Sequence, residues 1–169
     1  YPQDSQTNVY DISSVGENII LGTGASGATF NIYNSDNTLL NRVYYSELSG
    51  DAYVPSQYLE EGTYKITISS VVGNPELIVY HKSMSKIPQT YIKDTTISVP
   101  IRSAAFYTIS FESATTLIKV IDGTVVLVYD SDLNRIDYTF GTQSLSNGTY
   151  YFLILSRIYN GNGSATITW

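Results

Sequence analysis

The sequence LEEGTYKITI, residues 59–68, recurs in altered form as LSNGTYYFLI at residues 145–154. In both copies a leucine is followed three residues later by Gly-Thr-Tyr and then by an apolar segment. In the first copy Tyr64, Ile66 and Ile68 alternate with polar residues, which is typical of a strand with one buried and one wet face. The repetition predicts two copies of one β-rich unit.

The repeat extends to both sides of this segment. Upstream, FNIYNSD at 30–36 matches VLVYDSD at 126–132, and each copy ends with a Gly/Asn turn and a last strand, 76–80 or 165–169. Short strands divided by Gly, Asn, Asp and Ser predict an all-β fold, and no segment has a useful helical period. Two small sandwiches, or one sandwich shared by both repeats, fit this pattern. We expect two repeated antiparallel β-sandwich units in tandem, of jelly-roll or immunoglobulin-like type.

Two segments differ from this alternation. GTVVLVYD at 123–130 and TYYFLILSRIY at 149–159 are nearly continuous apolar runs. Such runs are typical of strands that are covered on both faces.

The expected organisation follows the repeat. Residues 1–15 form a polar N-terminal tail, 16–80 the first sandwich, 81–95 a linker and 96–169 the second sandwich. An exposed sheet edge can accept a further strand, and the tail can either lie on its own domain or pair with the next subunit. Its candidate donor-strand residues are Val9, Tyr10, Ile12 and Val15.

Composition excludes several classes of function. The 169-residue chain is 43% apolar and 14% charged, which is a folded composition. Its net charge of −6 and nine scattered Lys and Arg argue against nucleic acid as a partner. The absence of cysteine excludes disulfides and thiolate metal sites. The sequence has no run of eighteen apolar residues, so no transmembrane segment is expected.

An extracellular, cell-surface location is expected. The chain begins with Tyr1 rather than Met, as a mature chain without its signal peptide would. Asn147 and Asn162 each begin an N-glycosylation sequon.

Three patterns resemble chemical sites. Residues 22–27 form G-x-G-x-x-G, but a strand pattern follows where a dinucleotide site needs a helix, so we expect a loop between strands. Residues 130–134 begin like an EF-hand, but Arg135 replaces the required glycine, so a structural turn is expected and no metal. His81, the only imidazole, is expected to be a solvated linker side chain. We therefore expect no catalytic residues, no cofactor and no enzyme.

Tyrosine is the outstanding residue, with 16 copies. Four tyrosines around a polar segment could form a platform for a partner or a glycan, of which we favour the partner, or they could close the ends of the sandwich. They are Tyr44, Tyr45, Tyr53 and Tyr58.

The L-x-x-G-T-Y segments, each preceded by an apolar strand ending in Y-[ND]-S-D, resemble the bacterial pre-peptidase C-terminal (PPC) domain family. The resemblance covers both repeats and implies jelly-roll-like β-sandwich modules, usually non-catalytic appendages of secreted enzymes. The catalytic domain that such modules accompany is not found in this sequence.

In its size, its Tyr, Ser, Thr and Asn content, its low charge, its lack of Cys and its sequons, the chain also resembles secreted surface proteins of thermoacidophilic crenarchaea. Within that group it is similar to the Sulfolobales-type subunits of the extracellular filaments called threads. This resemblance implies glycosylated β-rich heads joined head to tail by an N-terminal donor strand. We therefore expect a self-assembling filament subunit for adhesion or biofilm scaffolding. The alternative is a monomeric PPC-like, carbohydrate-binding or receptor-binding module of a secreted or viral protein.

Cys-free surface fibres sometimes carry Lys–Asn or Lys–Asp isopeptide bonds. Lys65 and Lys119 are the candidates because they lie within expected strands. An ordinary strand lysine with its amine in solvent is the simpler expectation.

Overall fold

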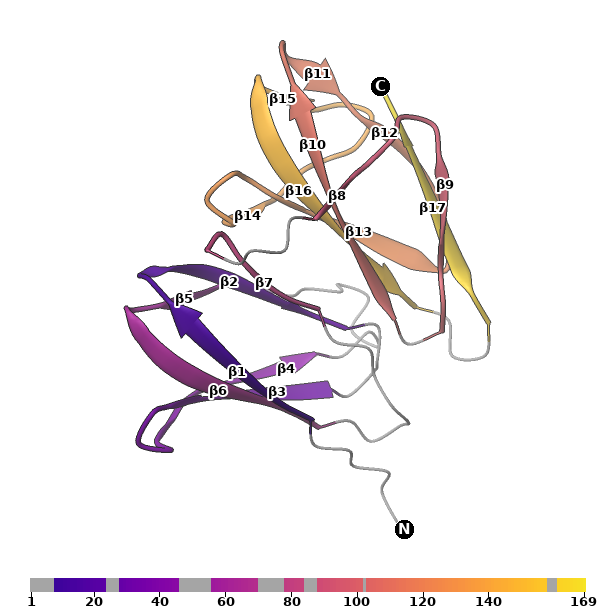
Figure 1. Ribbon diagram of the computed structural model, residues 1–169. Helices are drawn as coiled ribbons and strands as arrows, with labels where there is room; N and C mark the ends of the chain where they lie inside the picture. Colours follow the sequence, from indigo (N-terminus) through magenta and orange to yellow (C-terminus); the bar gives the residue numbers. More distant parts are fainter. Residues whose placement is uncertain are drawn as a thin grey trace.

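A computed structural model describes residues 8–23, 28–45, 56–69, 78–83, 88–101, 103–157 and 161–169. Within these ranges the chain forms strands and turns and no helix, which confirms the all-β prediction. Every strand pair is antiparallel except β8–β10. Figure 1 shows the strands in two groups, β1–β7 below and β8–β17 above, which we call the first and second halves.

The first half contains two sheets. Sheet I has the order β1-β6-β3-β4, and sheet II has the order β5-β2-β7. The strands of sheet I are β1 (Asn8–Ser14), β6 (Gly62–Ser69), β3 (Ala28–Asn34) and β4 (Leu39–Tyr45). Those of sheet II are β5 (Gln57–Leu59), β2 (Glu17–Gly22) and β7 (Ile78–His81).

The second half contains two larger sheets and a short pair of strands. Sheet III has the order β14-β13-β16-β10-β8, sheet IV has the order β12-β17-β9, and β11 pairs with β15. The strands of sheet III are β14 (Arg135–Ile136), β13 (Thr124–Tyr129), β16 (Gly148–Ser156), β10 (Ala104–Phe111) and β8 (Gln89–Thr90). The others are β12 (Ile118–Asp122), β17 (Gly163–Thr168), β9 (Thr96–Val99), β11 (Thr115–Thr116) and β15 (Ser144–Leu145).

The sequence repeat is also a repeat of topology. The order β1-β6-β3-β4 matches β10-β16-β13-β14, and the register matches as well. Ile12 lies opposite Tyr64 in sheet I, and Ile109 lies opposite Tyr150 in sheet III. The N-terminal strand β1 is therefore the counterpart of β10. Strands β8 and β9, which come from residues 88–99, are additions of the second half.

The repeated L-x-x-G-T-Y motif has a structural explanation. The Tyr64 hydroxyl donates a hydrogen bond to the Glu60 carbonyl oxygen at 2.6 Å, and the Tyr150 hydroxyl donates to that of Ser146 at 2.8 Å. Each tyrosine thus fastens its strand to the turn four residues upstream, as a tyrosine corner does in other sandwiches. Gly148 has a φ of 143°, which L side chains rarely adopt, so the motif requires glycine there.

The hydrophobic core is continuous between the halves. One cluster of buried residues contains Ile20, Phe30 and Ile66 of the first half together with Leu127 and Leu153 of the second. A second cluster lies within the second half and includes Val126, Val128, Phe152 and Ile154. Alternate residues of β13 and β16 therefore face different cores, which confirms the prediction that these two strands are covered on both faces.

Candidate functional site

The N-terminal strand β1 holds most of the predicted donor residues. Tyr10 and Ile12 pack against the first core, whereas Val9 and Val15 are 56% and 63% exposed. Strand β1 pairs with β6 of the same chain and with no other described strand, so it is an edge strand. Residues 8–14 of the predicted tail therefore form a strand of their own domain in this structure. Residues 1–7 lie outside the described part of the chain.

A tight connection joins β1 to sheet II. Gly16, between β1 and β2, has a φ of 76°, which favours glycine. A Cβ added there would lie 3.2 Å from the Tyr58 hydroxyl. The chain passes from β1 of sheet I to β2 of sheet II within this turn.

Two of the four tyrosines of the predicted aromatic surface, Tyr44 and Tyr58, have described side chains, and they lie on different sheets. Tyr44 is 64% exposed and alternates with the buried Val43, so it lies on the outer face of sheet I. Tyr58 is 63% exposed on β5 of sheet II. Tyr45 ends β4, its side chain is not among those described, and Tyr53 lies outside the described ranges.

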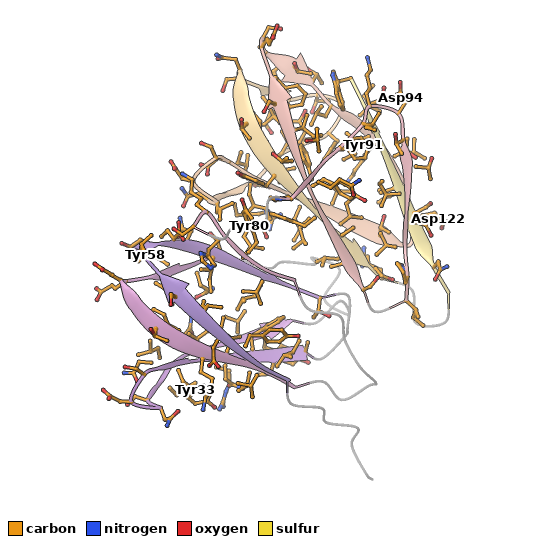
Figure 2. The ribbon with its side chains drawn as sticks, in the orientation of Figure 1. Tyr33, Tyr58, Tyr80, Tyr91, Asp94 and Asp122 are labelled. Carbon is orange, nitrogen blue, oxygen red and sulfur yellow. The ribbon has the colours of Figure 1, made fainter. Side chains whose placement is uncertain are left out.

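A cavity of about 350 Å³ opens beside Tyr58, between the edge strands β4 and β5. Its apolar lining comes from Ile32, Leu40, Leu59 and the rings of Tyr58 and Tyr64. Its polar lining is supplied by Asn41, Gln57 and Glu60. An aromatic face beside amide and carboxylate groups is the arrangement that a sugar ring or a partner side chain would use. Figure 2 shows Tyr58 at the β5 side of the first half.

His81 is not a solvated linker residue, and that expectation was wrong. It ends β7, is 7% exposed, and its Nδ1 lies 2.8 Å from Glu17 Oε1 on β2. The backbone N–H of Ser83 donates to the same oxygen at 3.0 Å. Burial opposes the charged Glu17 carboxylate, but the hydrogen bonds from His81 and Ser83 outweigh burial and lower its pKa.

A polar seam joins the two halves at residues 130–134. Lys82 Nζ pairs with Asp132 Oδ1 at 2.9 Å. Asn18 Nδ2 donates to the Asp132 carbonyl oxygen at 3.0 Å and to Asn134 Oδ1 at 3.1 Å. The turn of the second half is thereby held against β2 and β7 of the first.

The same turn answers the question of a metal site. Asp130 Oδ1 accepts hydrogen bonds from the backbone N–H groups of Asp132 and Asn134, both at 2.9 Å. In the first half Asn34 Oδ1 accepts from Asp36 and Thr38 in the same way. The Asp130 oxygen thus serves the backbone of a structural turn, as predicted, while Asp132 Oδ1 and Asn134 Oδ1 accept from Lys82 and Asn18. No group of three or more metal-binding side chains converges in the described part of the chain.

The glycine-rich motif has a packing role at its first residue. Residues 17–22 form β2 and residues 28–34 form β3, so strands flank the loop as predicted; residues 24–27 lie outside the described ranges. Gly22 faces the second half, where an added Cβ would come within 2.8 Å of Leu153 Cδ2. The close approach of the Leu153 side chain favours glycine there.

An aromatic cluster seals the same boundary. The ring centroid of Tyr80 lies 4.9 Å from that of Phe106 and 5.5 Å from that of Tyr151. Burial, followed by the hydrogen bond with Tyr151, raises the pKa of the Tyr80 phenol. Figure 2 shows Tyr80 where the two groups of strands meet.

The two isopeptide candidates have different surroundings. Lys65 Nζ donates to Asn37 Oδ1 at 3.0 Å in an exposed turn and lies 5.0 Å from the centroid of the Tyr33 ring. Lys119 Nζ lies 4.6 Å from the centroid of the Phe140 ring, and burial lowers its pKa. Neither amine sits beside a buried carboxylate in the described residues, which is the group that would assist such a bond.

Both sequon asparagines are exposed. Asn147 lies between β15 and β16, and Asn162 lies directly before β17. Both positions can be reached by a glycosylating enzyme.

The described part of the chain contains no helix that is long and apolar enough to span a membrane. Comparison of the chain with protein-family models, curated proteins and solved structures finds no match. The resemblances to PPC domains and to thread subunits therefore stay predictions.

Sequence reasoning missed the residues that join the halves. Asn18 and Lys82 are far in the sequence from Asp132, to which both are bonded, and no motif links them. Leu133 left a clearer signal, because Asn37 occupies its place in the repeated turn and an apolar residue there has no local purpose. In the structure Leu133 is completely buried in the first core.

Proposed function

We propose that the protein is a non-enzymatic structural subunit of an extracellular surface filament. It consists of two β-sandwich units in tandem, β1–β7 and β8–β17, and assembles head to tail by passing β1 to the neighbouring subunit. The observation that carries the proposal is the position of β1, which lies at the edge of sheet I and is held there by β6 alone among the described strands. A strand so placed can leave its sheet without drawing other strands with it.

Exchange of β1 conserves its contacts. The backbone ladder to β6 and the packing of Tyr10 and Ile12 on the first core are the same whether β1 comes from the same chain or from its neighbour. The turn at Gly16 is the hinge that must straighten, and glycine tolerates both conformations. An exchange that passes from each subunit to the next is heterologous and generates an open fibre.

The second half cannot take part in the same way. Its counterpart strand β10 lies between β16 and β8 and is therefore paired on both sides. Because β1 is paired on one side only, the first half releases its equivalent strand more readily. This asymmetry gives each subunit one donor and one acceptor, as a linear filament requires.

The Cys-free sequence permits a direct test. Ser13 and Thr63 are exposed cross-strand partners on β1 and β6, so a Ser13→Cys/Thr63→Cys variant places two thiols within disulfide reach. If strands are exchanged, oxidised filaments give a ladder of covalent multimers on denaturing gels. The matched control is Ser110→Cys/Thr149→Cys at the equivalent pair of β10 and β16, which must stay monomeric on the same gel.

Electron microscopy of the native protein completes the test. Wild-type protein is expected to form filaments, and a chain lacking residues 1–15 is not. Filaments that dissociate into monomers after oxidation of Ser13→Cys/Thr63→Cys, or that survive the truncation, would rule out exchange of β1. The exposed Asn147 and Asn162 are expected to carry glycans on the filament surface.

A second candidate function is supported by the cavity beside Tyr58. A monomeric module could bind a carbohydrate or receptor segment there, with Tyr58 stacking on the ligand and Asn41, Gln57 and Glu60 fixing its orientation. Glycan-array binding that is lost in Tyr58→Ala and kept in Tyr44→Ala, with no filaments in the microscope, would favour this function.

A further inference from the structure

The edge strand β12 combines features that soluble proteins normally avoid. In sheet IV it pairs with β17 on one side and with no described strand on the other. Three of its five residues are exposed apolar side chains: Ile118 at 52%, Val120 at 70% and Ile121 at 41%. Exposed apolar edges recruit further strands unless charge, proline or a covering segment blocks them.

The backbone groups that face this open edge can be assigned. Ile167, the partner of Lys119 on β17, directs its N–H and C=O to Tyr91 and Asp94 and thus away from β12. Lys119 and Ile167 therefore form a non-hydrogen-bonded pair, in which the backbone groups of both residues point away from each other. The N–H and C=O of Lys119 thus face the open edge of β12. By the two-residue alternation those of Leu117 and Ile121 do so too.

Only the first of these three positions is covered. The Leu117 N–H donates to the Tyr138 hydroxyl at 2.8 Å, and its carbonyl oxygen accepts from the Gly141 N–H at 2.7 Å. Lys119 and Ile121 have no backbone partner on this side among the described residues. Lys119 does not block the edge, because its side chain turns inward over the Phe140 ring.

The counterpart of β12 in the first half is β2, which has a neighbouring strand on each side. Strand β2 occupies the equivalent place and is the central strand of sheet II, with β5 on one side and β7 on the other. In the second half β15 pairs with β11 only, at residues 115–116, so residues 118–122 lack the outer neighbour. Strand β12 therefore has the composition of a central strand in an edge position.

We propose that β12 pairs with β12 of a second copy of this chain in an antiparallel, two-fold symmetric contact. In the register centred on Val120, Lys119 of each copy exchanges both backbone hydrogen bonds with Ile121 of the other, and the two Val120 side chains meet on the axis. Sheet IV of each copy thereby becomes half of one continuous six-stranded sheet.

Charge selects a second copy at this edge and not at the others. In the β12 register Asp122 faces Ile118 of the other copy, and no like charges are opposed. The other edge strands of five or more residues are β1 and β4, whose central residues are Asp11 and Arg42. Self-pairing about these centres would oppose two like charges. In Figure 2 Asp122 marks the end of β12 at the outer side of the second half.

The contact is independent of β1 and therefore of the proposed filament. In a filament it would join subunits of neighbouring fibres side by side. A pair of five-residue strands buries less than a standard interface, so a weak dimer is expected, with dissociation between about 10 µM and 1 mM.

The experiment uses the full chain carrying the Ser13→Cys/Thr63→Cys pair, oxidised as a monomer and separated from covalent multimers, so that β1 is locked within its own chain and strand exchange cannot contribute. Its mass is followed by sedimentation at concentrations up to about 1 mM. We expect a concentration-dependent dimer that is lost in Val120→Lys, where lysine acts as an edge-blocking residue. Ile92→Lys, at a residue 72% exposed and outside β12, is the matched control and must still dimerise.

Amide exchange measured by NMR reports the register. On dimerisation the N–H groups of Lys119 and Ile121 are expected to become protected, whereas those of Ile118 and Val120, already bonded to β17, change little. A monomer at the highest concentration, a dimer unaffected by Val120→Lys, or protection that appears on another strand instead would overturn the proposal.

Discussion

His81 Nδ1 lies 2.8 Å from Glu17 Oε1, in a site where the two side chains are 8% and 12% exposed. The pair links β7, the last strand of the first half, to β2, the central strand of sheet II. It also orders the start of the connection between the halves, because Glu17 accepts the Ser83 N–H as well. Removing the carboxylate would leave a buried imidazole and a backbone donor without their partner.

Glu17→Ala is therefore expected to lower the free energy of unfolding by about 1 to 3 kcal/mol, the range for a buried polar group left without its partner. The change also removes a pH dependence. Because the pKa of Glu17 is lowered in the folded state, its stabilisation is present above the carboxyl's unfolded pKa and is lost as pH falls through the folded value. Urea unfolding at pH values from neutral to strongly acidic measures both effects.

The matched control is Lys82→Gln, which breaks the neighbouring ion pair with Asp132. Those side chains are 44% and 71% exposed, so a change within about 1 kcal/mol is expected. Equal effects of the two substitutions would contradict a special role for Glu17.

The two tyrosine corners predict similar behaviour at equivalent positions. Tyr64→Phe and Tyr150→Phe each remove one hydroxyl-to-carbonyl hydrogen bond and leave the ring in place, so each is expected to cost about 0.5 to 1.5 kcal/mol, with Tyr150→Phe at the upper end because it also loses the bond to Ser146 Oγ. Thermal unfolding measures the loss. Tyr44→Phe, on an exposed tyrosine, should leave the melting temperature unchanged, and a loss as large as that at the corners would refute the interpretation.

The close approach of Gly22 and Leu153 predicts coupling across the two halves. Gly22→Ala overpacks the contact and is expected to cost about 1 to 3 kcal/mol. Leu153→Ala opens a cavity at the same place and is expected to cost about 2 to 5 kcal/mol. Since the added methyl group occupies part of the cavity, the double variant should be more stable than the sum predicts, by about 1 kcal/mol or more. Strict additivity in a denaturant-unfolding cycle would show that the residues do not touch.

The sequence was informative wherever structure is local. The L-x-x-G-T-Y segments and the turns at 34–38 and 130–134 are built from side chains and backbone within a few residues, so their repetition predicted the duplicated strand order. The apolar runs of β13 and β16 likewise predicted that these strands are covered on both faces.

The boundary between the halves could not be predicted in this way. The contacts of Lys82 with Asp132, Gly22 with Leu153 and Asn18 with Asp132 join residues far apart in the chain, and each residue has an ordinary local explanation. The segment 88–95, expected to be a linker, contains β8 and the buried Tyr91 because both find partners on β10 and β17. Such partners become visible only when the sheets are placed against one another.

Leu133 provides the sharpest test of how the halves hold together. It has a φ of 62°, a conformation that costs a leucine free energy, yet it is 0% exposed within the first core. Asn37, its counterpart in the repeated turn, has the same φ of 62° and is exposed. The burial of the Leu133 side chain in the first core thus compensates for the backbone strain of its turn. The exposed Asn37 has no such compensation.

Leu133→Asn installs the counterpart residue, which tolerates this φ, and removes the buried side chain from the other half. We expect the turn to persist and the first half to lose about 2 to 4 kcal/mol of stability. Circular dichroism reports both halves, whereas the fluorescence of Trp169, packed on Phe111 and Tyr91, reports the second alone. In wild-type protein the two signals should change together in urea. In Leu133→Asn the dichroism should begin to change at lower urea than the fluorescence, and coincident transitions would show that Leu133 does not couple the halves.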